Sequence, residues 1–435
     1  MISLAQLRRE PDVVKGALVR RGVSLATMDE ILALDVEHRA LLQEDERLRA
    51  EIKELSRQVG DARRSKNADA AESLSQTSRD LGERERAAND AVERVAVELN
   101  AKLLMVPNVP DPKVPDGVDE SDNVELRRWW VDMDKGAPQP AYADHQRVPH
   151  WEIGTELGIL DMESGAKLAG SMFPLYRGAG SRLLRALGSF SLDRQLADYE
   201  ELRPPSFALT ETMMATGHLP KSADDMYAIE RDGLWAIPTG EVPLTSMRRG
   251  EIIDEAMLPI RFTTQTACFR REAGAAGKDT RGLLRVHEFD KVELFAYCTP
   301  DQADSAHADI LRRAEELLQA LGLTYRLLNL CTGDLGTASA YTIDLEVFSP
   351  GVARWLEVSS VSWFRDYQAR RASVRFRTSE GKVEFVHTVN GSALGWSRVW
   401  AAVVETYRQA DGTVRLPDVL APYMGGQTTI RPRTS

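Results

Sequence analysis

Leucine recurs every seven residues in the first quarter of the chain, at Leu34, Leu41, Leu48 and Leu55. After a short polar break, "GDARRSKNADA", the same spacing returns at Leu74, Leu81, Ala88 and Val95. A seven-residue apolar repeat keeps one stripe of a helix facing a partner helix along its whole length. Two such stretches around one break predict an antiparallel helical hairpin over about residues 28–105.

The same repeat is also typical of a coiled coil that joins two separate chains. The turn-like break between two halves of similar length favours the hairpin. His38 and Asp45 occupy positions in the repeat where apolar residues are expected, so part of the seam between the helices is imperfect.

A segment rich in proline and aspartate, "VPNVPDPKVPDGVDESDN", follows the repeat and shows no periodicity. Such a composition predicts a linker, which gives an N-terminal domain at residues 1–108, a linker at 109–125 and a second domain at 126–435. In the second domain, "HADILRRAEELLQALG" has helical spacing, while "ASVRFRT" and "VEFVHTV" alternate as strands of a hairpin around "SEGK". Strands paired through hairpins, with helices grouped apart, predict an α+β fold on an antiparallel sheet.

Composition excludes several other classes of protein. The net charge of the 435 residues is -11, so a polyanionic partner must meet a local basic surface. Three scattered cysteines suit neither a disulfide framework nor a zinc site. No run approaches the roughly 20 apolar residues of a membrane span, and the N-terminus lacks the apolar core of a signal peptide. We therefore expect a cytoplasmic protein without a membrane segment.

The most charged motif is "CFRREAGAAGKDTRGLLRVHEFDKVE", residues 268–293, which we interpret as a strand, a long turn and a returning strand. Alternation puts Arg270 and Glu272 on one face, away from Arg271. On the returning strand, one face carries Phe289, Lys291 and Glu293. Guanidinium groups on a rigid sheet suit bidentate contacts to a polyphosphate and stacking on a purine. The alternative is a solvated hairpin whose arginines only form salt bridges.

Three further motifs point to the same chemistry. In "WAIPTGEVPLTSM", Thr239 and Glu241 could hold an ammonium group and a polar side chain. In "WLEVSSVS", alternation places Glu357 and Ser359 on one face and Ser360 on the other; a carboxylate and a hydroxyl beside a triphosphate suit Mg²⁺. "TVNGSALGWSRVW" leads from a strand through Gly391 into a helix whose first turns carry Arg398, which indicates an anion site.

Together with "LCTGDLG", "DYQARR" and "QADGTVRLPDVLAPYMGG", these motifs follow the order found in seryl-tRNA synthetases, which the chain resembles over essentially its whole length. The resemblance implies a class II synthetase catalytic domain, a homodimer, and an N-terminal coiled-coil arm that reaches tRNA. It also implies that "DYEELRPPSF" is the family's first motif, with Pro205 at the dimer interface.

The implied reaction is the activation of L-serine by ATP to seryl-adenylate, followed by transfer to the 3′ end of tRNA(Ser), with Mg²⁺ as cofactor. The serine site would consist of Thr239, Gly240, Glu241, Glu293, Asn390 and Ser392. The ATP site would consist of Arg270, Arg271, Glu272, Glu357, Val358, Ser359, Ser360 and Arg398. Glu357 and Ser360 would share the metal, and the catalytic residues would be Arg270 on the α-phosphate, Arg398 on the γ-phosphate, and Glu272.

The chain departs from the family pattern most clearly at Trp363 and Trp396, which stand where small or polar residues are common. Two interpretations remain open: the indole rings line or brace the adenylate pocket, or they pack behind the sheet. The first would suit a specialised second copy, which resists an antibiotic that mimics seryl-adenylate or supplies seryl-tRNA to a biosynthetic pathway.

Three other classes fit the sequence less well. A non-catalytic tRNA-binding homologue would not need the retained carboxylates and arginines. A ligase that charges a carrier protein would lack the long arm. A coiled-coil interaction protein would leave the catalytic motifs unexplained.

Overall fold

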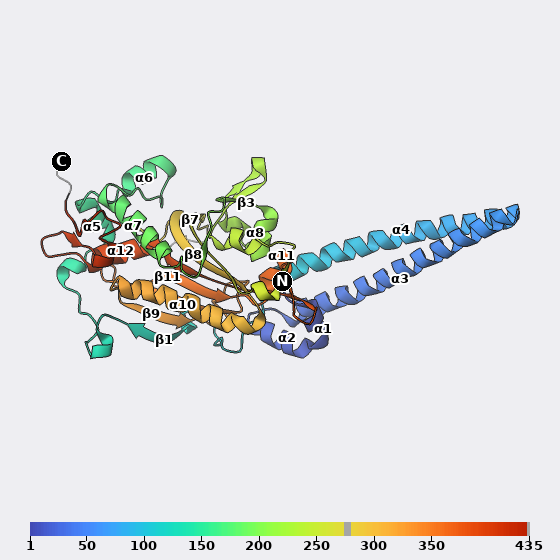
Figure 1. Ribbon diagram of the computed structural model, residues 1–435, viewed down its shortest axis with the longest axis horizontal. Coiled ribbons are helices and arrows are strands. Elements are labelled where there is room, and N and C mark those ends of the chain that lie inside the picture. Colours follow the sequence, from blue (N-terminus) through green and yellow to red (C-terminus); the bar gives the residue numbers. More distant parts are fainter. Residues whose placement is uncertain (274–279, 433–435) are drawn as a thin grey trace. The chain divides into compact units, whose positions relative to one another are not determined.

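The computed structural model describes residues 1–273 and 280–432, which form two compact units: residues 2–107, and residue 1 together with the described residues from 108 onward. The first unit is helical, with α1 (Leu4–Arg9), α2 (Pro11–Val19), α3 (Leu25–Arg64) and α4 (Ala68–Met105). The two long helices pack along each other as an antiparallel pair (Figure 1). The predicted helical hairpin is therefore confirmed.

Polar residues in the seam of this hairpin are held by arginines. Asp35 is 2% exposed and lies 3.0 Å from the guanidinium of Arg8 and 3.1 Å from that of Arg39. Asp45, which the repeat marks as imperfect, is also buried and pairs with Arg49 at 3.2 Å. Because a buried charge is costly unless it is paired, these arginines let the helices tolerate polar residues at the seam.

The second unit is built on an eight-stranded sheet with the order β1-β9-β10-β11-β14-β8-β7-β2. Its strands are β1 (Val124–Trp129), β2 (Glu200–Glu201), β7 (Ile260–Phe269), β8 (Glu288–Cys298), β9 (Tyr325–Asn329), β10 (Tyr341–Ser349), β11 (Arg354–Trp363) and β14 (His387–Gly395). All neighbours are antiparallel except β2, which pairs in parallel with β7. The predicted α+β fold on an antiparallel sheet is confirmed.

The two faces of this sheet have different chemistry. Figure 1 shows the helices α7 (Ala179–Asp193), α10 (Ala303–Ala320) and α12 (Trp396–Thr406). They contribute to one hydrophobic core with Val292, Leu294 and Ala296 of β8. Successive side chains of a strand point to opposite faces, so Lys291 and Glu293 lie on the other face. One face of the sheet thus packs the main core. The other face carries the polar side chains of Lys291 and Glu293 and, farther along β8, a second hydrophobic cluster with Phe295 and Tyr297.

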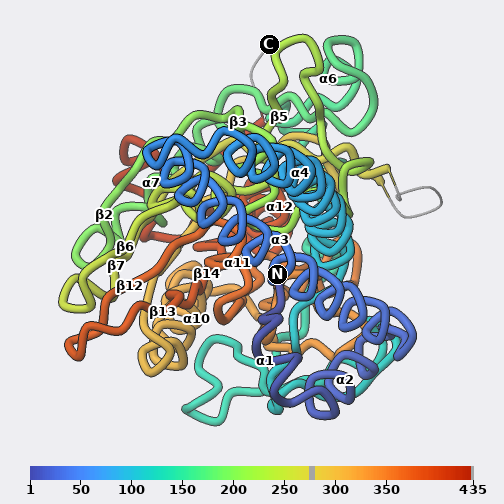
Figure 2. Tube along the Cα trace, turned by 90° about the vertical axis from the view of Figure 1, so that its right-hand side faces the viewer, coloured from blue at the N-terminus to red at the C-terminus, as the bar shows by residue number. Residues whose placement is uncertain are grey.

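The remaining elements surround this sheet, and a smaller sheet places β12 (Arg375–Arg377) between β13 (Val383–Phe385) and β6 (Ile252–Asp254) (Figure 2). The predicted hairpin around "SEGK" is formed by β12 and β13. The other elements are α5 (His150–Glu156), α6 (Met162–Ala169), α8 (Thr210–Thr216), α9 (Glu241–Ser246), α11 (Tyr367–Ala372), β3 (Phe207–Leu209), β4 (Ala228–Ile229), β5 (Leu234–Ala236), β6 (Ile252–Asp254), β12 (Arg375–Arg377), β13 (Val383–Phe385), β15 (Val414–Arg415) and β16 (Thr429–Ile430).

Two sequence expectations concern loops and membranes. Part of the long turn predicted after Glu272, residues 274–279, lies outside the described residues. Within the ranges 1–273 and 280–432, no helix combines the length and the apolar character that crossing a bilayer requires.

Candidate active site

A cavity of about 360 Å³ lies on the polar face of the large sheet, over β8, β11 and β14. Most residues predicted from the sequence to bind substrates line it: Thr239, Glu241, Arg270, Glu272, Glu293, Glu357, Val358, Ser360, Asn390, Ser392 and Arg398. Segments that are more than 150 residues apart in the sequence therefore contribute to one site. Three predicted residues, Gly240, Arg271 and Ser359, are not among the described residues that line the cavity.

One end of the cavity is a buried polar network around Glu293, which is 1% exposed. Its carboxylate accepts hydrogen bonds from the Thr239 hydroxyl at 3.0 Å and from the Asn390 amide at 3.1 Å. Lys291 forms an ion pair with the same carboxylate and donates to the Thr239 hydroxyl at 2.7 Å. Burial raises the pKa of Glu293, and the ammonium group of Lys291 opposes this rise.

A second carboxylate, Glu241, is oriented by a glutamine from α11. The Gln368 amide donates to Glu241 Oε1 at 2.6 Å and to the Thr216 carbonyl at 3.3 Å, and it accepts from the Thr388 hydroxyl at 2.7 Å. Burial raises the pKa of Glu241, and the hydrogen bond from Gln368 lowers it again. These two acidic groups at one end of the cavity suit a ligand that carries an ammonium group.

Sequence reasoning missed both Gln368 and Lys291 as site residues. Gln368 belongs to "DYQARR", which served only to establish the family resemblance. Lys291 was placed on the correct face of its strand, beside Glu293, but no role followed from that placement. Its burial against Glu293 becomes evident only when the strands are paired.

If the carboxylates of Glu241 and Glu293 bind serine, as the family resemblance implies, replacing Gln368 by Met should weaken serine binding. A hydrogen bond to a charged group is worth about 1.5 kcal/mol, so we expect the serine KM to rise about tenfold near neutral pH, with the ATP KM nearly unchanged. The ionised carboxylate of Glu241 is the form that holds an ammonium group, and its pKa is already raised. Serine binding should therefore weaken as the pH falls, and in the variant this loss should begin at a higher pH. Serine KM measured across pH for both proteins checks this; superimposable profiles would contradict it.

Three arginines also line the cavity: Arg270, Arg285 and Arg398. Arg270 lies over the ring of Phe289, with its guanidinium carbon 5.1 Å from the ring centroid. Arg285, which was not predicted as a site residue, pairs with Glu272 at 3.2 Å. Arg398, in the first turn of α12, donates to the Leu284 carbonyl at 3.0 Å and to the Glu357 carbonyl at 2.8 Å. The guanidiniums converge on one cavity, which the alternative of a solvated salt-bridged hairpin does not explain.

Arg271 points away from the cavity, as predicted, but β7 ends at Phe269, so the predicted strand does not extend to Arg271. Its guanidinium donates to the Asp224 carbonyl at 2.9 Å, and its backbone amide donates to the Asp225 carbonyl at 2.9 Å. Gly240 packs closely against Glu293, since a Cβ at Gly240 would lie 3.1 Å from the Glu293 Cβ. Both residues can therefore influence the site through their neighbours.

The expectation that Glu357 and Ser359 share a face was wrong. In the pairing of β10 with β11, Leu345 faces Ser359 and Glu346 faces Glu357, so Val358 is an extra residue in β11. Such a bulge shifts the alternation by one residue. It brings Glu357 and Ser360 to the cavity together, whereas the Ser359 hydroxyl donates to the Ser392 carbonyl at 2.7 Å.

The oxygen atoms of this bulge fit a hard divalent cation. Glu357 supplies a carboxylate and Ser360 a hydroxyl, and Asp344 faces Ser360 across the strand pair. One oxygen of Asp344 has no hydrogen-bond partner in the described structure. No cluster of three or more His, Cys, Asp or Glu side chains that could hold a metal occurs in the described ranges. Mg²⁺ commonly takes only one or two carboxylates and completes its shell with phosphates and water.

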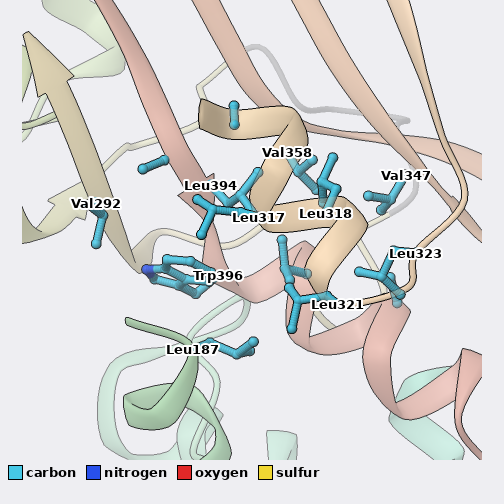
Figure 3. Packing of buried hydrophobic residues seen from close by; sticks show 14 of the residues in the cluster. Leu187, Val292, Leu317, Leu318, Leu321, Leu323, Val347, Val358, Leu394 and Trp396 are labelled. Atoms are coloured by element: carbon cyan, nitrogen blue, oxygen red, sulfur yellow. The ribbon is translucent and has the colours of Figure 1, made fainter. Parts of the chain in front are cut away.

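The two unusual tryptophans pack in the core. Ser360 and Ser362 share one face of β11 and line the cavity. The Trp363 side chain lies on the opposite face of the strand, where it belongs to the hydrophobic core. Its indole donates to His387 Nδ1 at 3.2 Å. Trp396 is fully buried and lies near Leu187 and Val292 (Figure 3). Neither ring is among the described residues that line the cavity. The structure confirms packing behind the sheet, and the specialised interpretation loses its main support.

Replacing Trp396 by Val should therefore act on stability. Removing a large aromatic side chain from a packed core costs about 3 kcal/mol of unfolding free energy, which chemical denaturation measures. Inhibition by a non-hydrolysable seryl-adenylate analogue should remain unchanged in the folded variant, and likewise in Trp363→Asn. A marked gain in inhibitor affinity would show instead that the rings shape the pocket.

Comparison with known proteins gives one consistent result. The family described as "Seryl-tRNA synthetase N-terminal domain" matches residues 1–110, and "tRNA synthetase class II core domain (G, H, P, S and T)" matches residues 227–407. The serine–tRNA ligase of Chloroflexus aurantiacus is 44% identical over 438 residues, covering 99% of this chain and 100% of the relative. That of Geobacter sulfurreducens is 45% identical over 429 residues, covering 98% and 99%.

Solved structures agree with these sequence relatives. The seryl-tRNA synthetase of Pyrococcus horikoshii, complexed with ATP, is 35% identical and superposes with a TM-score of 0.91 over 100% of both chains. The cytoplasmic serine–tRNA ligase of Naegleria fowleri, in complex with AMP, is 27% identical with a TM-score of 0.84, covering 98% of this chain and 96% of that one.

Proposed function

We propose that this chain, which belongs to the seryl-tRNA synthetase family of class II aminoacyl-tRNA synthetases, is a serine–tRNA ligase. It uses ATP to convert L-serine into seryl-adenylate and then transfers the seryl group to the 3′ end of tRNA(Ser). The observation that carries the proposal is the cavity itself, which brings the carboxylates of Glu241 and Glu293 together with the guanidiniums of Arg270, Arg285 and Arg398.

The carboxylate end binds serine. Glu241 and Glu293 hold the ammonium group and the hydroxyl, with Thr239, Asn390 and Ser392 beside them. Serine is small, so selectivity depends on its hydroxyl. A site with buried partners for a hydroxyl rejects an analogue that lacks it, because those partners would be left unsatisfied. Alanine is therefore a poor substrate.

The arginine end binds ATP and supports adenylate formation. A carboxylate oxygen of serine attacks the α-phosphorus in line, and pyrophosphate leaves from the opposite side. Arg270 holds the α-phosphate oxygens, whose negative charge grows in the transition state, and Arg398 holds the γ-phosphate. Positioning and electrostatic stabilisation supply the acceleration, so no protein nucleophile is needed. Bound through Glu357 and Ser360, Mg²⁺ would neutralise part of the phosphate charge.

Transfer requires tRNA. A hydroxyl of the terminal ribose attacks the acyl carbon of seryl-adenylate, its proton is lost, and AMP leaves. The N-terminal unit is the proposed tRNA-binding domain, and basic residues near the tip of its hairpin are candidates for phosphate contacts: Arg57, Arg63, Arg64 and Lys66. Arg57 and Arg64 already pair with Glu54 and Asp61. Exposed ion pairs of this kind are weak, so a tRNA phosphate can take the place of the carboxylate in each pair.

The chain works as a homodimer, with Pro205 of the first motif at the interface, and β2 of that motif is the edge strand of the large sheet. It acts in the cytoplasm, where tRNA is charged. The relatives carry the name serine–tRNA ligase, and nothing in them favours a specialised copy over this role.

Serine-dependent exchange between ATP and pyrophosphate tests the proposal. Labelled pyrophosphate should enter ATP when serine is present and should do so far less with alanine. A non-catalytic tRNA-binding homologue would show no exchange with either amino acid.

A further inference from the structure

A histidine and a glutamate outside the cavity form a fully buried pair. His150, the first residue of α5, and Glu405, near the end of α12, both have side chains with 0% exposure. His150 Nδ1 lies 2.7 Å from Glu405 Oε1, which also accepts the His150 backbone amide at 2.9 Å. The other carboxylate oxygen accepts from the Ser349 hydroxyl and, at 3.0 Å, from the Gly351 amide. Both oxygens of this carboxylate are thus held by donors.

The second ring nitrogen of His150 contacts a backbone segment that lines the cavity. The backbone amide of Leu283 donates to His150 Nε2 at 2.9 Å. A backbone amide can only donate, so Nε2 must present a lone pair, and the proton must reside on Nδ1, where it is donated to Glu405. Glu405 thereby selects the tautomer of His150 whose Nε2 can accept the hydrogen bond from the Leu283 amide.

The anchored segment belongs to the nucleotide end of the cavity. Leu283, Leu284 and Arg285 line it, and the Leu284 carbonyl accepts from Arg398 Nε at 3.0 Å. The approach is close, since a Cβ at Gly282 would lie 2.5 Å from His150 Nε2, and Gly282 has φ +58°. Glu405 and Arg398 stand on the same helix, α12. The buried pair of His150 and Glu405 therefore connects this cavity-lining segment to α12, the helix that carries Arg398.

We infer that His150 is a positioning residue for ATP: together with Glu405 it fixes the backbone at Leu283 and Leu284, and so sets where Arg285 and Arg398 meet the triphosphate. The inference rests on the proposed function, since it assigns ATP to this end of the cavity. Serine binding, at the opposite end, does not depend on this contact.

Two substitutions of His150 separate its two hydrogen bonds. In His150→Asn, the side-chain amide can replace Nδ1 and keep the bond to Glu405, but it cannot reach the Leu283 amide. In His150→Gln, the longer side chain places its carbonyl near the former position of Nε2 and can accept from Leu283 again. The Asn variant therefore tests the anchor, and the Gln variant is its rescue.

Pyrophosphate exchange with the full-length protein provides the kinetic readout. We expect His150→Asn to raise the ATP KM about tenfold, as the loss of one well-placed contact does, with the serine KM changed by less than about twofold. His150→Gln should return the ATP KM toward the parent value. Hydrogen exchange of the Leu283 amide should be faster in the Asn variant than in the parent and slow again in the Gln variant.

Several results would overturn the inference: an unchanged ATP KM in folded His150→Asn, equal defects for serine and ATP, or a Gln variant as impaired as the Asn variant. Should the Asn variant not fold, Glu405→Met removes the acceptor that holds the proton on His150 Nδ1, and an unchanged ATP KM there has the same meaning. A parent protein without serine-dependent exchange would instead contradict the proposed function, while exchange of the Leu283 amide would still report on the anchor.

Discussion

Arg270→Ala should lower serine-dependent pyrophosphate exchange by two to three powers of ten. The guanidinium lines the cavity and is held over the Phe289 ring, so it is oriented before ATP binds. Removing one such contact to a developing anion costs about 3–4 kcal/mol of transition-state stabilisation. The loss should appear mainly in kcat, because the charge on the α-phosphate oxygens grows as the carboxylate attacks.

Two further variants serve as controls for Arg270→Ala. Arg270→Lys should recover only part of the rate, because a single ammonium cannot reproduce the two parallel contacts of a guanidinium. Arg249→Ala removes an exposed arginine of the same unit that is not among the cavity residues, and it should leave exchange unchanged. Normal exchange by folded Arg270→Ala would refute the assignment of this strand to the α-phosphate.

Deleting residues 30–104 should abolish tRNA charging and leave adenylate formation intact. The described cavity residues run from Thr216 to Arg398, so none belongs to the deleted segment. The cut can be closed by a short linker, because Lys102 and Glu30, at the base of the hairpin, form an ion pair of 2.8 Å. Pyrophosphate exchange and charging, measured on the same preparation, separate the two activities.

A milder variant tests which part of the arm matters. Arg63→Ala combined with Lys66→Ala, at the tip, should weaken charging and reduce its sensitivity to salt, because tRNA phosphates that the arm no longer neutralises keep their counterions on binding. Equal charging by the deleted and the parent protein would exclude the arm as the tRNA-binding element.

The sequence predicted the main architecture because its patterns were long and regular. The heptad repeat predicted α3 and α4, and the alternation around Lys291 predicted which side chains of β8 share a face. The strand of Trp363 was a different case, because uninterrupted alternation puts this residue on the same face as Glu357. Only the extra residue at Val358 places the ring on the opposite face, in the core.

Features that depend on pairing between distant segments were not predictable in this way. The extra residue at Val358 reverses the alternation of β11, and it is visible only against the register of β10. Gln368 orients Glu241 across 127 positions in the sequence. His150 accepts a hydrogen bond from the Leu283 amide, although the two residues are 133 positions apart in the sequence. In each case the three-dimensional neighbour, and not the local pattern, determines the role.

Charging of tRNA with labelled serine tests the central claim most directly. With ATP and Mg²⁺, the purified protein should attach serine to tRNA(Ser), should leave a tRNA for another amino acid uncharged, and should fail on tRNA(Ser) whose terminal ribose has been oxidised with periodate. Serine-dependent pyrophosphate exchange without any transfer to intact tRNA(Ser) would contradict the assignment of this chain as a serine–tRNA ligase.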